Sequence, residues 1–255
     1  MNPADTTRTP ARWPLVIGWL AVAALVLTIA LVAYTGPAYR AGWIDIRMAI
    51  FTLLRWCFYG AVACVVLGLA ATIVNFWRGS RTMAAAGVIT LLVGLGLAFN
   101  FLSWRNAGQS VPPIHDISTD LQNPPAFVDI VPLRADAPNP PEYAGAETAE
   151  QQRTAYPDLE PIRVAAPPAE AFRAALEVVR GMGWELVAEA PTQGRIEATD
   201  TTRYFGFKDD VVIRIRADNG GSIVDIRSKS RVGRSDVGTN AQRIRDFREQ
   251  LRKRV

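Results

Sequence analysis

The amino-acid sequence predicts an α+β protein in which three N-terminal transmembrane helices precede a soluble two-layer α/β sandwich with an antiparallel sheet. Three observations lead to this fold class. Apolar stretches of bilayer length come first, most of the prolines follow them, and strand and amphipathic helix patterns begin near residue 161. We therefore divide the chain into a transmembrane region at 1–104, a proline-rich linker or wrapping segment at 105–160, and a soluble α+β domain at 161–255.

Charge is distributed unevenly along the 255 residues. Residues 1–104 carry 7 basic and 2 acidic side chains, whereas residues 105–255 carry 21 basic and 22 acidic ones. The pI near 9.3 therefore comes from arginines that flank the apolar stretches. A nucleic-acid-binding protein would concentrate its positive charge on the soluble part, so we expect no nucleic-acid partner.

The first apolar stretch, residues 15–35, has 21 positions without a charge. As a helix it is about 31 Å long, which matches the hydrocarbon core of a bilayer. Pro14 fits the first turn of such a helix, and Gly36-Pro37 is expected to end it. A cleaved signal peptide is the alternative, but the stretch is too long for one and two further spans follow it.

The second and third spans are expected at about 56–76 and 83–102. Arg55 precedes the second span and can extend to the lipid headgroups. Both spans carry small residues at every fourth position, which lets backbones approach closely, so we expect a tightly packed helical hairpin. Small residues are also common in membrane helices in general, which is the alternative explanation. The residues are Gly60, Cys64, Gly68 and Thr72 in one span and Ala86, Thr90, Gly94 and Ala98 in the other.

The arginines near the span ends set the expected orientation. Arg8, Arg12, Arg78 and Arg81 lie on one side, against Arg40, Arg47 and Arg105 on the other. Because cytoplasmic loops carry an excess of basic residues, we expect the N-terminus in the cytoplasm and the soluble domain outside. For a bacterial source this means a multi-pass inner-membrane protein with a periplasmic domain, with the lipid bilayer as its first partner.

Residues 105–168 contain 12 of the 17 prolines, which prevents regular sheet or long helix over most of this length. A short helix is expected from about Ala146 to Tyr156, where Glu147, Glu150 and Arg153 share a face. The remainder is expected to be extended, and either to wrap the domain or to space it from the bilayer.

The last part of the chain mixes helix and strand patterns. Ala169 to Gly181 has helical periodicity, and an amphipathic helix that should cover one face of the sheet starts near Val237. Asp218-Asn219-Gly220-Gly221 predicts a tight turn between the last two strands. Trp184, Leu186 and Ala188 are expected on one strand face. Strand alternation is found at 184–188, 196–198, 211–216 and 224–227.

Residues that commonly carry catalysis or bind metals are scarce. Cys57 and Cys64 lie in one apolar stretch, about 10 Å apart along a helix axis, which is too far for a disulfide. His115, the one histidine, is better explained as a solvated or hydrogen-bonded side chain than as a general base. We therefore expect no metal site, no cofactor and none of the familiar catalytic triads.

Three runs of residues in the soluble part resemble a known family. They are GRIEAT at 194–199, FGFKDDV at 205–211, and RSKSRVGRSDVGTN at 227–240 with Arg243 beyond. Over about 114–251 the chain resembles the uncharacterised family catalogued as domain of unknown function 1499. The resemblance implies a membrane-anchored bacterial protein or a chloroplast-lumen protein, in agreement with the outside placement, and it supplies no reaction.

The third run also predicts a binding site on physical grounds, because it ends a strand and opens a helix beside several arginines. Such a helix start attracts phosphates, carboxylates or lipid headgroups. Ser235, Asp236 or Thr239 can cap the helix, and Thr239 with Gln242 fits a capping box. The alternative is structural, with the arginines pairing to aspartates and holding the hairpin against the helix. The candidate residues for binding an anion or a partner are Arg227, Ser228, Arg231, Ser235, Asp236, Asn240, Arg243, Asp209 and Asp210.

Two functions follow as hypotheses. The first is a non-enzymatic envelope protein whose outside domain binds a protein partner or an anionic envelope ligand. The second is an enzyme of unknown type that acts on a phosphorylated or acidic substrate. Asp209 and Asp210 are adjacent and would point to opposite faces of a strand, so they cannot form an acid–base pair, and no catalytic residue is assigned. Transport is disfavoured because the spans contain no central charge pair and no broken helix.

Overall fold

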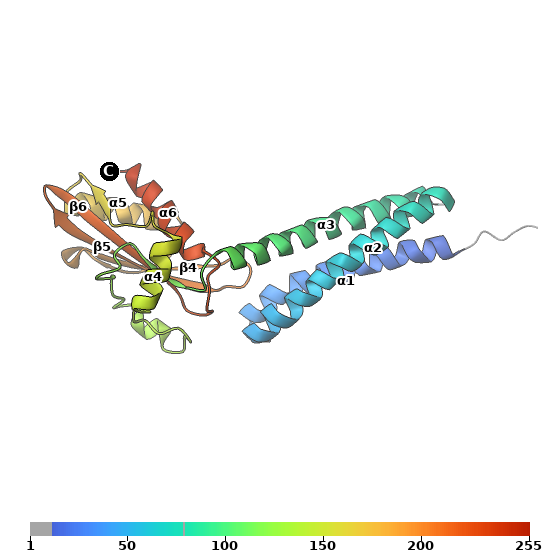
Figure 1. Ribbon diagram of the computed structural model, residues 1–255, viewed down its shortest axis with the longest axis horizontal. Coiled ribbons are helices and arrows are strands. Elements are labelled where there is room, and N and C mark those ends of the chain that lie inside the picture. Colours follow the sequence, from blue (N-terminus) through green and yellow to red (C-terminus); the bar gives the residue numbers. More distant parts are fainter. Residues whose placement is uncertain (1–11, 79) are drawn as a thin grey trace, which may run out of the picture. The chain divides into compact units, whose positions relative to one another are not determined.

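The computed structural model of the protein describes residues 12–78 and 80–255, so Arg8, one of the arginines used for the orientation, lies outside the described part. The chain forms two compact units, Met1–Arg105 and Asn106–Val255. The predicted α+β class is confirmed, because three long apolar helices come first and an antiparallel sheet with helices follows (Figure 1).

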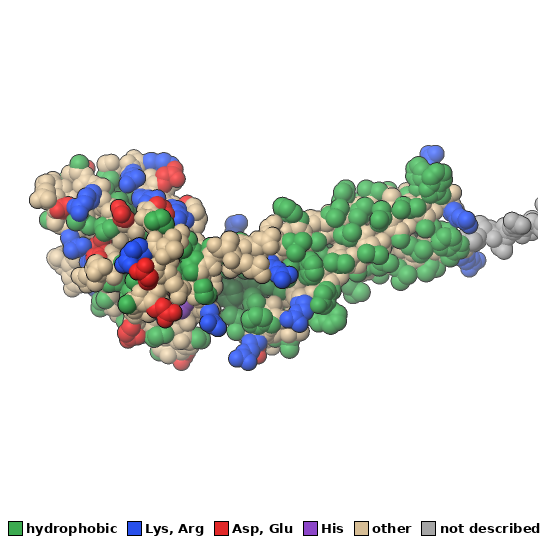
Figure 2. Space-filling view, viewed as in Figure 1, with side chains coloured by type: hydrophobic (Ala, Val, Ile, Leu, Met, Phe, Trp, Pro, Cys, Tyr) green, Lys and Arg blue, Asp and Glu red, His purple; other side chains and the backbone are tan. Residues whose placement is uncertain are grey.

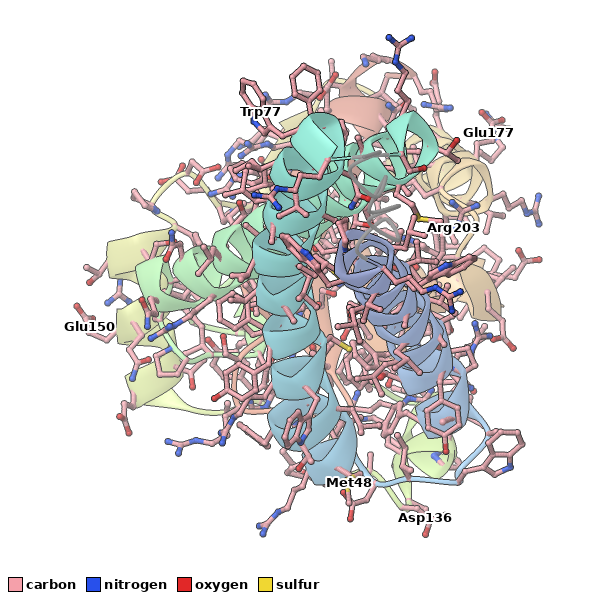
Figure 3. The ribbon with its side chains drawn as sticks, turned by 90° about the vertical axis from the view of Figure 1, so that its right-hand side faces the viewer. Met48, Trp77, Asp136, Glu150, Glu177 and Arg203 are labelled. Atoms are coloured by element: carbon pink, nitrogen blue, oxygen red, sulfur yellow. The ribbon has the colours of Figure 1, made fainter. Side chains whose placement is uncertain are left out.

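The first unit consists of helices that are long and apolar enough to cross a membrane. Apolar side chains cover them along their length, and basic side chains gather at their ends (Figure 2). Trp77 and Met48 lie at the periphery of this unit with exposed side chains (Figure 3). The helices are α1 (Trp13–Arg40), α2 (Leu54–Arg78) with a preceding π-helical stretch η1 (Met48–Leu53), and α3 (Arg81–Ser110).

Each of these helices is longer than the span predicted from the sequence. α1 continues through Gly36-Pro37, because Pro37 lacks a donor but its carbonyl still accepts from the Ala41 amide at 2.9 Å. α3 likewise continues past Arg105 to Ser110. A charge or a proline at the end of an apolar stretch marks the limit of the hydrocarbon, whereas the backbone hydrogen bonds of the helix run on.

Small residues bring the backbones of α2 and α3 together. A Cβ added at Gly68 would lie 2.5 Å from the Leu91 amide nitrogen, and one at Gly94 would lie 2.9 Å from the Ala61 carbonyl oxygen. Gly60, a member of the same predicted stripe as Gly68, faces Thr28 of α1 instead. The small side chains of α2 therefore serve two neighbouring helices.

The second unit contains a six-stranded sheet in which every pairing is antiparallel. β5 and β6 form its central hairpin, and the two turn residues Asn219 and Gly220 have φ angles of 42° and 88°, as the predicted tight turn requires. β4 and β3 extend the sheet beyond β5, while β1 and β2 pair one after the other along the free edge of β6. The strands are β1 (Asp116–Ser118), β2 (Ile162–Val164), β3 (Glu185–Ala190), β4 (Arg195–Thr201), β5 (Lys208–Asp218) and β6 (Gly221–Ser230).

Two helices, α5 (Pro168–Gly181) and α6 (Thr239–Arg252), cover one face of the sheet (Figure 1). Ile213, Ile226 and Phe247 are completely buried between these layers, and each such side chain contributes about 1.5–3 kcal/mol of transfer free energy. Both helices lie where the periodicity predicted them. A third helix, α4 (Ala146–Ala155), matches the short helix expected in the proline-rich stretch.

The other face of the sheet is covered by residues 120–145, which we call the strap. Phe127 and Ile130 pack on Val212 of β5. The Glu197 carboxylate of β4 accepts the Val128 and Ile130 amides, both at 2.8 Å. The strap contains one 3-10 turn, η2 (Val131–Arg134), and wraps the sheet, which is one of the two roles considered for the proline-rich stretch.

The prediction that Leu186 and Ala188 share a face is wrong. A β-bulge between them places Leu186 opposite Ala198 and Ala188 opposite Glu197, two residues of β4 that point to opposite faces. A bulge adds one residue to a strand and reverses the alternation beyond it. β3 is followed by the 3-10 turn η3 (Pro191–Gln193), which leads into β4.

Candidate functional site

The predicted site residues lie around β5, β6 and the start of α6, but they occupy both faces of the sheet. Adjacent residues of a strand point to opposite faces, as expected for Asp209 and Asp210. Asp209 and Ser228 contact α6, whereas Asp210, Arg227 and Arg231 lie under or beside the strap. The structure thus separates the predicted set into two groups.

Arg243 and Asn240 of α6 organise the group on the helix side. The Arg243 guanidinium donates to Asp209 and Asp200, both at 2.7 Å, and to the Ser228 hydroxyl at 3.1 Å. The Asn240 side-chain oxygen accepts from the Ser228 hydroxyl at 2.7 Å. Because Asp209, Ser228, Asn240 and Arg243 are buried, this network fastens the helix to the end of the sheet.

Asp210 is the centre of the group on the strap side. Its carboxylate accepts from Arg134 of η2 at 2.6 Å, from Arg231 through two nitrogens at 2.8 Å, and from the Thr199 hydroxyl at 2.7 Å. Arg134 also donates to the carbonyl of Asn139 at 2.9 Å. Both carboxylate oxygens are therefore held by arginine side chains.

A second carboxylate, Asp116 of β1, holds two further cations of this face. Arg227 donates to it through two nitrogens at 2.8 and 2.9 Å, and the Lys229 ammonium lies 3.2 Å away. Lys229 also donates to the Glu142 carbonyl at 2.5 Å. Burial lowers the pKa of Lys229, and the neighbouring Asp116 opposes this shift.

The strap supplies acceptors for the cations that surround Asp116 and Asp210. Four basic side chains, Arg134, Arg227, Lys229 and Arg231, face two carboxylates, Asp116 and Asp210. The backbone carbonyls of Pro125 and Pro141 accept from Arg227 at 3.2 and 3.0 Å. The rings of Phe127 and Tyr143 lie 4.7 and 5.4 Å from its guanidinium carbon. Burial raises the pKa of Tyr143 to about 12, so the phenol stays neutral beside this cluster.

The loop before α6 uses Asp236 as its cap. The Asp236 carboxylate accepts from the Gly238 and Asn240 amides at 2.9 and 2.7 Å, so it occupies the helix start where an anion was expected. The predicted capping box is wrong, because Gln242 donates to Asp246 instead. Ser235 accepts from the Val237 amide within the loop. Burial raises the pKa of Asp236, while the two amide hydrogen bonds oppose the shift.

His115 lies at the start of β1. Its Nδ1 is 3.4 Å from the Arg234 carbonyl, and its own carbonyl accepts the Ser230 amide. Burial lowers the pKa of His115, which favours the neutral ring. Within residues 12–78 and 80–255, no three His, Cys, Asp or Glu side chains converge as metal ligands would.

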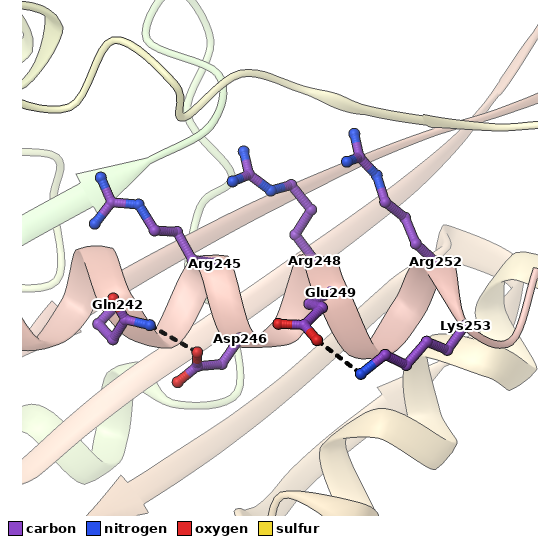
Figure 4. A pocket seen from close by; sticks show the side chains of 7 residues that line it. All are labelled: Gln242, Arg245, Asp246, Arg248, Glu249, Arg252 and Lys253. Atoms are coloured by element: carbon purple, nitrogen blue, oxygen red, sulfur yellow. Dashed lines mark hydrogen bonds and ion pairs between the residues drawn. The ribbon is translucent and has the colours of Figure 1, made fainter.

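Open surface is found on the outer side of α6, where a shallow hollow has a volume of about 490 Å³. Arg245, Arg248 and Arg252 extend side by side above it (Figure 4). Asp158 accepts from Arg245 at 2.7 Å and from Arg248 at 3.2 Å, and chiefly the hydrogen bond from Arg245 lowers the pKa of Asp158 to about 2. A second hollow of about 370 Å³ lies at the β5–β6 turn. None of the nine predicted residues lines either hollow.

Several residues of the two groups were not among the sequence-based candidates. Arg134 and Asp116 are separated from their partners by 76 and 111 positions along the chain, so no local pattern connects them. One signal was present in the sequence. Arg227, Lys229 and Arg231 alternate with residues of the helix-covered face, so they share the opposite face. Three cations on one face require that the segment packed on them supplies carboxylates or backbone carbonyls as acceptors.

The comparison with protein families agrees with the three sequence runs on which the resemblance rests. Residues 116–251 match the family described as "Protein of unknown function (DUF1499)", which is more than half of the chain and includes β1 to β6, the strap and most of α6. Comparison with curated proteins gives no match. The chain therefore belongs to the DUF1499 family.

Proposed function

We propose that the protein is a multi-pass inner-membrane protein with a cytoplasmic N-terminus and a periplasmic C-terminal domain, and that this domain is a binding module rather than an enzyme. Its ligand would be an acidic surface, carried by a partner protein or by an anionic envelope molecule. Three apolar helices support the membrane location. Arg12, Arg78 and Arg81 support the orientation, because they lie on the side of the N-terminus.

The basic row on α6 is the observation that carries the binding proposal. Arg245, Arg248 and Arg252 stand at helical spacings of three and four, so they form a row about 10 Å long on one side of the helix (Figure 4). Asp158 neutralises part of the charge of the first two. Arg252 makes no ion pair with any residue that the structure describes, and it is free to meet an external carboxylate or phosphate.

The predicted set around Arg227 has a different part in this proposal. The side chains of Arg227 and Arg243 are 2% and 4% exposed, whereas that of Arg231 is 15% exposed. We assign Arg227 and Arg243 to holding the strap and α6, and Arg231 to an outer rim that an acidic ligand can touch. The enzymatic alternative is disfavoured because Asp209 and Asp210 are both paired with arginines.

The test measures binding of a fluorescent oligoglutamate peptide to the detergent-extracted full chain. Replacing Arg245, Arg248 and Arg252 together with Gln should weaken binding by about tenfold, which corresponds to about 1.4 kcal/mol. The matched control replaces Arg163, Arg173 and Arg180 with Gln, which removes the same charge from exposed sites elsewhere. Equal losses in the two variants would mean that net charge alone acts, and would overturn the assignment to α6.

The role of Arg231 is tested separately, by native mass spectrometry of the extracted protein. Arg231→Ala should lower the fraction of molecules that retain an acidic ligand, because the rim loses a charge-assisted hydrogen-bond donor. Retention equal to that of the unaltered chain would remove Arg231 from the binding surface.

A further inference from the structure

Exposed apolar side chains of the second unit are few and gather mainly at one place. Within residues 106–255, Val131 and Leu133 of η2 and Tyr204 of the β4–β5 loop are exposed, with Val128 further back along the strap. The remaining large apolar side chains of this unit are at least partly covered. Exposed apolar residues that cluster on an otherwise polar domain mark a surface that contacts another apolar phase or molecule.

Arg231 shows that η2 and the β4–β5 loop are neighbours. Its amide donates to the carbonyl of Lys208, the residue that closes the loop, at 2.9 Å. Its guanidinium donates to the carbonyl of Leu133 at 2.9 Å. One arginine at the end of β6 therefore joins both apolar segments.

The chain arrives from α3 at this same end of the sheet. The Ser230 amide donates to the His115 carbonyl at 3.0 Å, and the Asp236 amide donates to the Ile114 carbonyl at 3.2 Å. We call this the proximal end of the sheet. The opposite end, at the β5–β6 turn, lies about 33 Å away along β5.

Chain length keeps the proximal end near the membrane if α3 spans it, as the proposed function holds. α3 has 30 residues and is about 45 Å long, roughly 15 Å longer than a hydrocarbon core. Between Ser110 and Asp116 the connection can extend at most about 20 Å. The proximal end is thus held within reach of the headgroup layer.

The charges at the proximal end favour an anionic lipid surface. Arg203, Lys208 and Arg234 are exposed there, while Asp136 is the exposed carboxylate that follows η2. Basic residues beside aromatic and aliphatic ones are the composition of surfaces that lie in a membrane interface.

We propose that the proximal end docks on the bilayer in which α3 is embedded, with Val131, Leu133 and Tyr204 at the boundary between headgroups and acyl chains, and with Arg203, Lys208 and Arg234 on anionic headgroups. Docking fixes η2 and the start of α6 next to the lipid. Docking then holds the basic row of α6 at a fixed distance from the bilayer, where partners can reach it. An acidic partner protein at the same end is the competing occupant, and the experiment below separates the two.

The test places single nitroxide labels on the full chain in lipid nanodiscs, after replacement of Cys57 and Cys64 by Ala. The label positions are Leu133, Tyr204, Leu95 of α3, and Arg163 at the distal end of the sheet. Collision with apolar oxygen is compared with collision with a soluble nickel complex, first in zwitterionic lipid and then with phosphatidylglycerol added. We expect the ratio of oxygen to nickel collisions at Leu133 and Tyr204 to be several-fold higher than at Arg163, and to rise further with anionic lipid.

Two variants separate the apolar and the charged contributions. With the label at Tyr204, Val131→Ser together with Leu133→Ser should lower the ratio in both lipids. Replacing Arg203, Lys208 and Arg234 with Ser should abolish the rise caused by phosphatidylglycerol. A water-like ratio at Leu133 and Tyr204 in both lipids, with a lipid-like ratio at Leu95, would overturn docking and favour a protein occupant. A water-like ratio at Leu95 would instead overturn the membrane location on which the proposal rests.

Discussion

At the scale of single residues, Asp210 links three parts of the domain that are distant in sequence. It joins β5 to the strap through Arg134, to the end of β6 through Arg231, and to β4 through Thr199. A buried ion pair contributes little compared with an apolar replacement, but removal of one partner leaves an uncompensated buried charge. The negative charge of Asp210 therefore offsets the cost of burying charge at Arg134 and Arg231.

Asp210→Asn should destabilise the second unit by about 3–5 kcal/mol, because the buried guanidinium of Arg134 and the partly buried one of Arg231 lose their shared counter-ion. The measurement is amide hydrogen exchange of β5, β6 and strap peptides in the full chain. Asp246→Asn is the matched control, since Asp246 is exposed and accepts a hydrogen bond from Gln242. Equal exchange in the two variants would show that the strap does not depend on Asp210.

The sequence predicts that Asp209 and Asp210 lie on opposite faces of a strand. It does not predict which residues pair with them. Strand periodicity alone places the two carboxylates on opposite faces, and the structure agrees. Arg134 and Asp116 lie in a proline-rich stretch without periodicity, so nothing local indicates which strand they contact. Ion pairs between distant segments depend on tertiary packing, which one sequence does not reveal.

At the scale of elements, the close contact between α2 and α3 depends on glycines at particular helical positions. A Cβ at Gly94 would lie 2.8 Å from the Cβ of Cys64 and 2.9 Å from the Val65 amide, whereas a Cβ at Gly96 would meet no atom within 4 Å. The two glycines are two positions apart on one helix and differ in their neighbours. They form a matched pair for measuring the packing.

Gly94→Ala should lower the midpoint of thermal unfolding in detergent, because the added methyl forces the helices apart at a cost of about 1–3 kcal/mol. Gly96→Ala should leave the midpoint unchanged or raise it slightly, since alanine has the better helix propensity and open space around it. Circular dichroism at the helical minimum measures both. If the two variants melt together, the hairpin is not held by close backbone contact.

Prediction of the elements succeeded where residues close in sequence determine the structure. It failed where contacts with a neighbouring helix or strand determine it. Asn219-Gly220 gives the β5–β6 turn because few residues tolerate its positive φ angles. Spacing by four residues identified Gly94 but omitted Gly87, whose added Cβ would lie 2.6 Å from the Thr72 amide. A helix has 3.6 residues per turn, so a stripe of fours drifts off the contact. The alternation of apolar and polar residues along β3 does not indicate the bulge after Leu186.

At the scale of the whole molecule, charge and apolar surface are divided between the two units. The apolar helices carry arginines at their ends, whereas the second unit nearly balances its acidic and basic residues and buries many of them as pairs. Helix ends rich in arginine determine the orientation during insertion, and a nearly neutral folded domain imposes little preference of its own. The orientation of the chain should therefore follow from a few arginines.

Labelling of single cysteines in intact cells measures this orientation, in a chain whose Cys57 and Cys64 are replaced by Ala. Ala41→Cys, between α1 and α2, and Glu160→Cys, in the second unit, should react with an impermeant maleimide added outside. Thr82→Cys, at the start of α3, should react only after permeabilisation, because two spans separate it from the N-terminus and return the chain to that side. All three positions are exposed, so burial cannot hide them. The reverse pattern would place the second unit in the cytoplasm, and the arginine excess would then lose its role as the determinant of orientation.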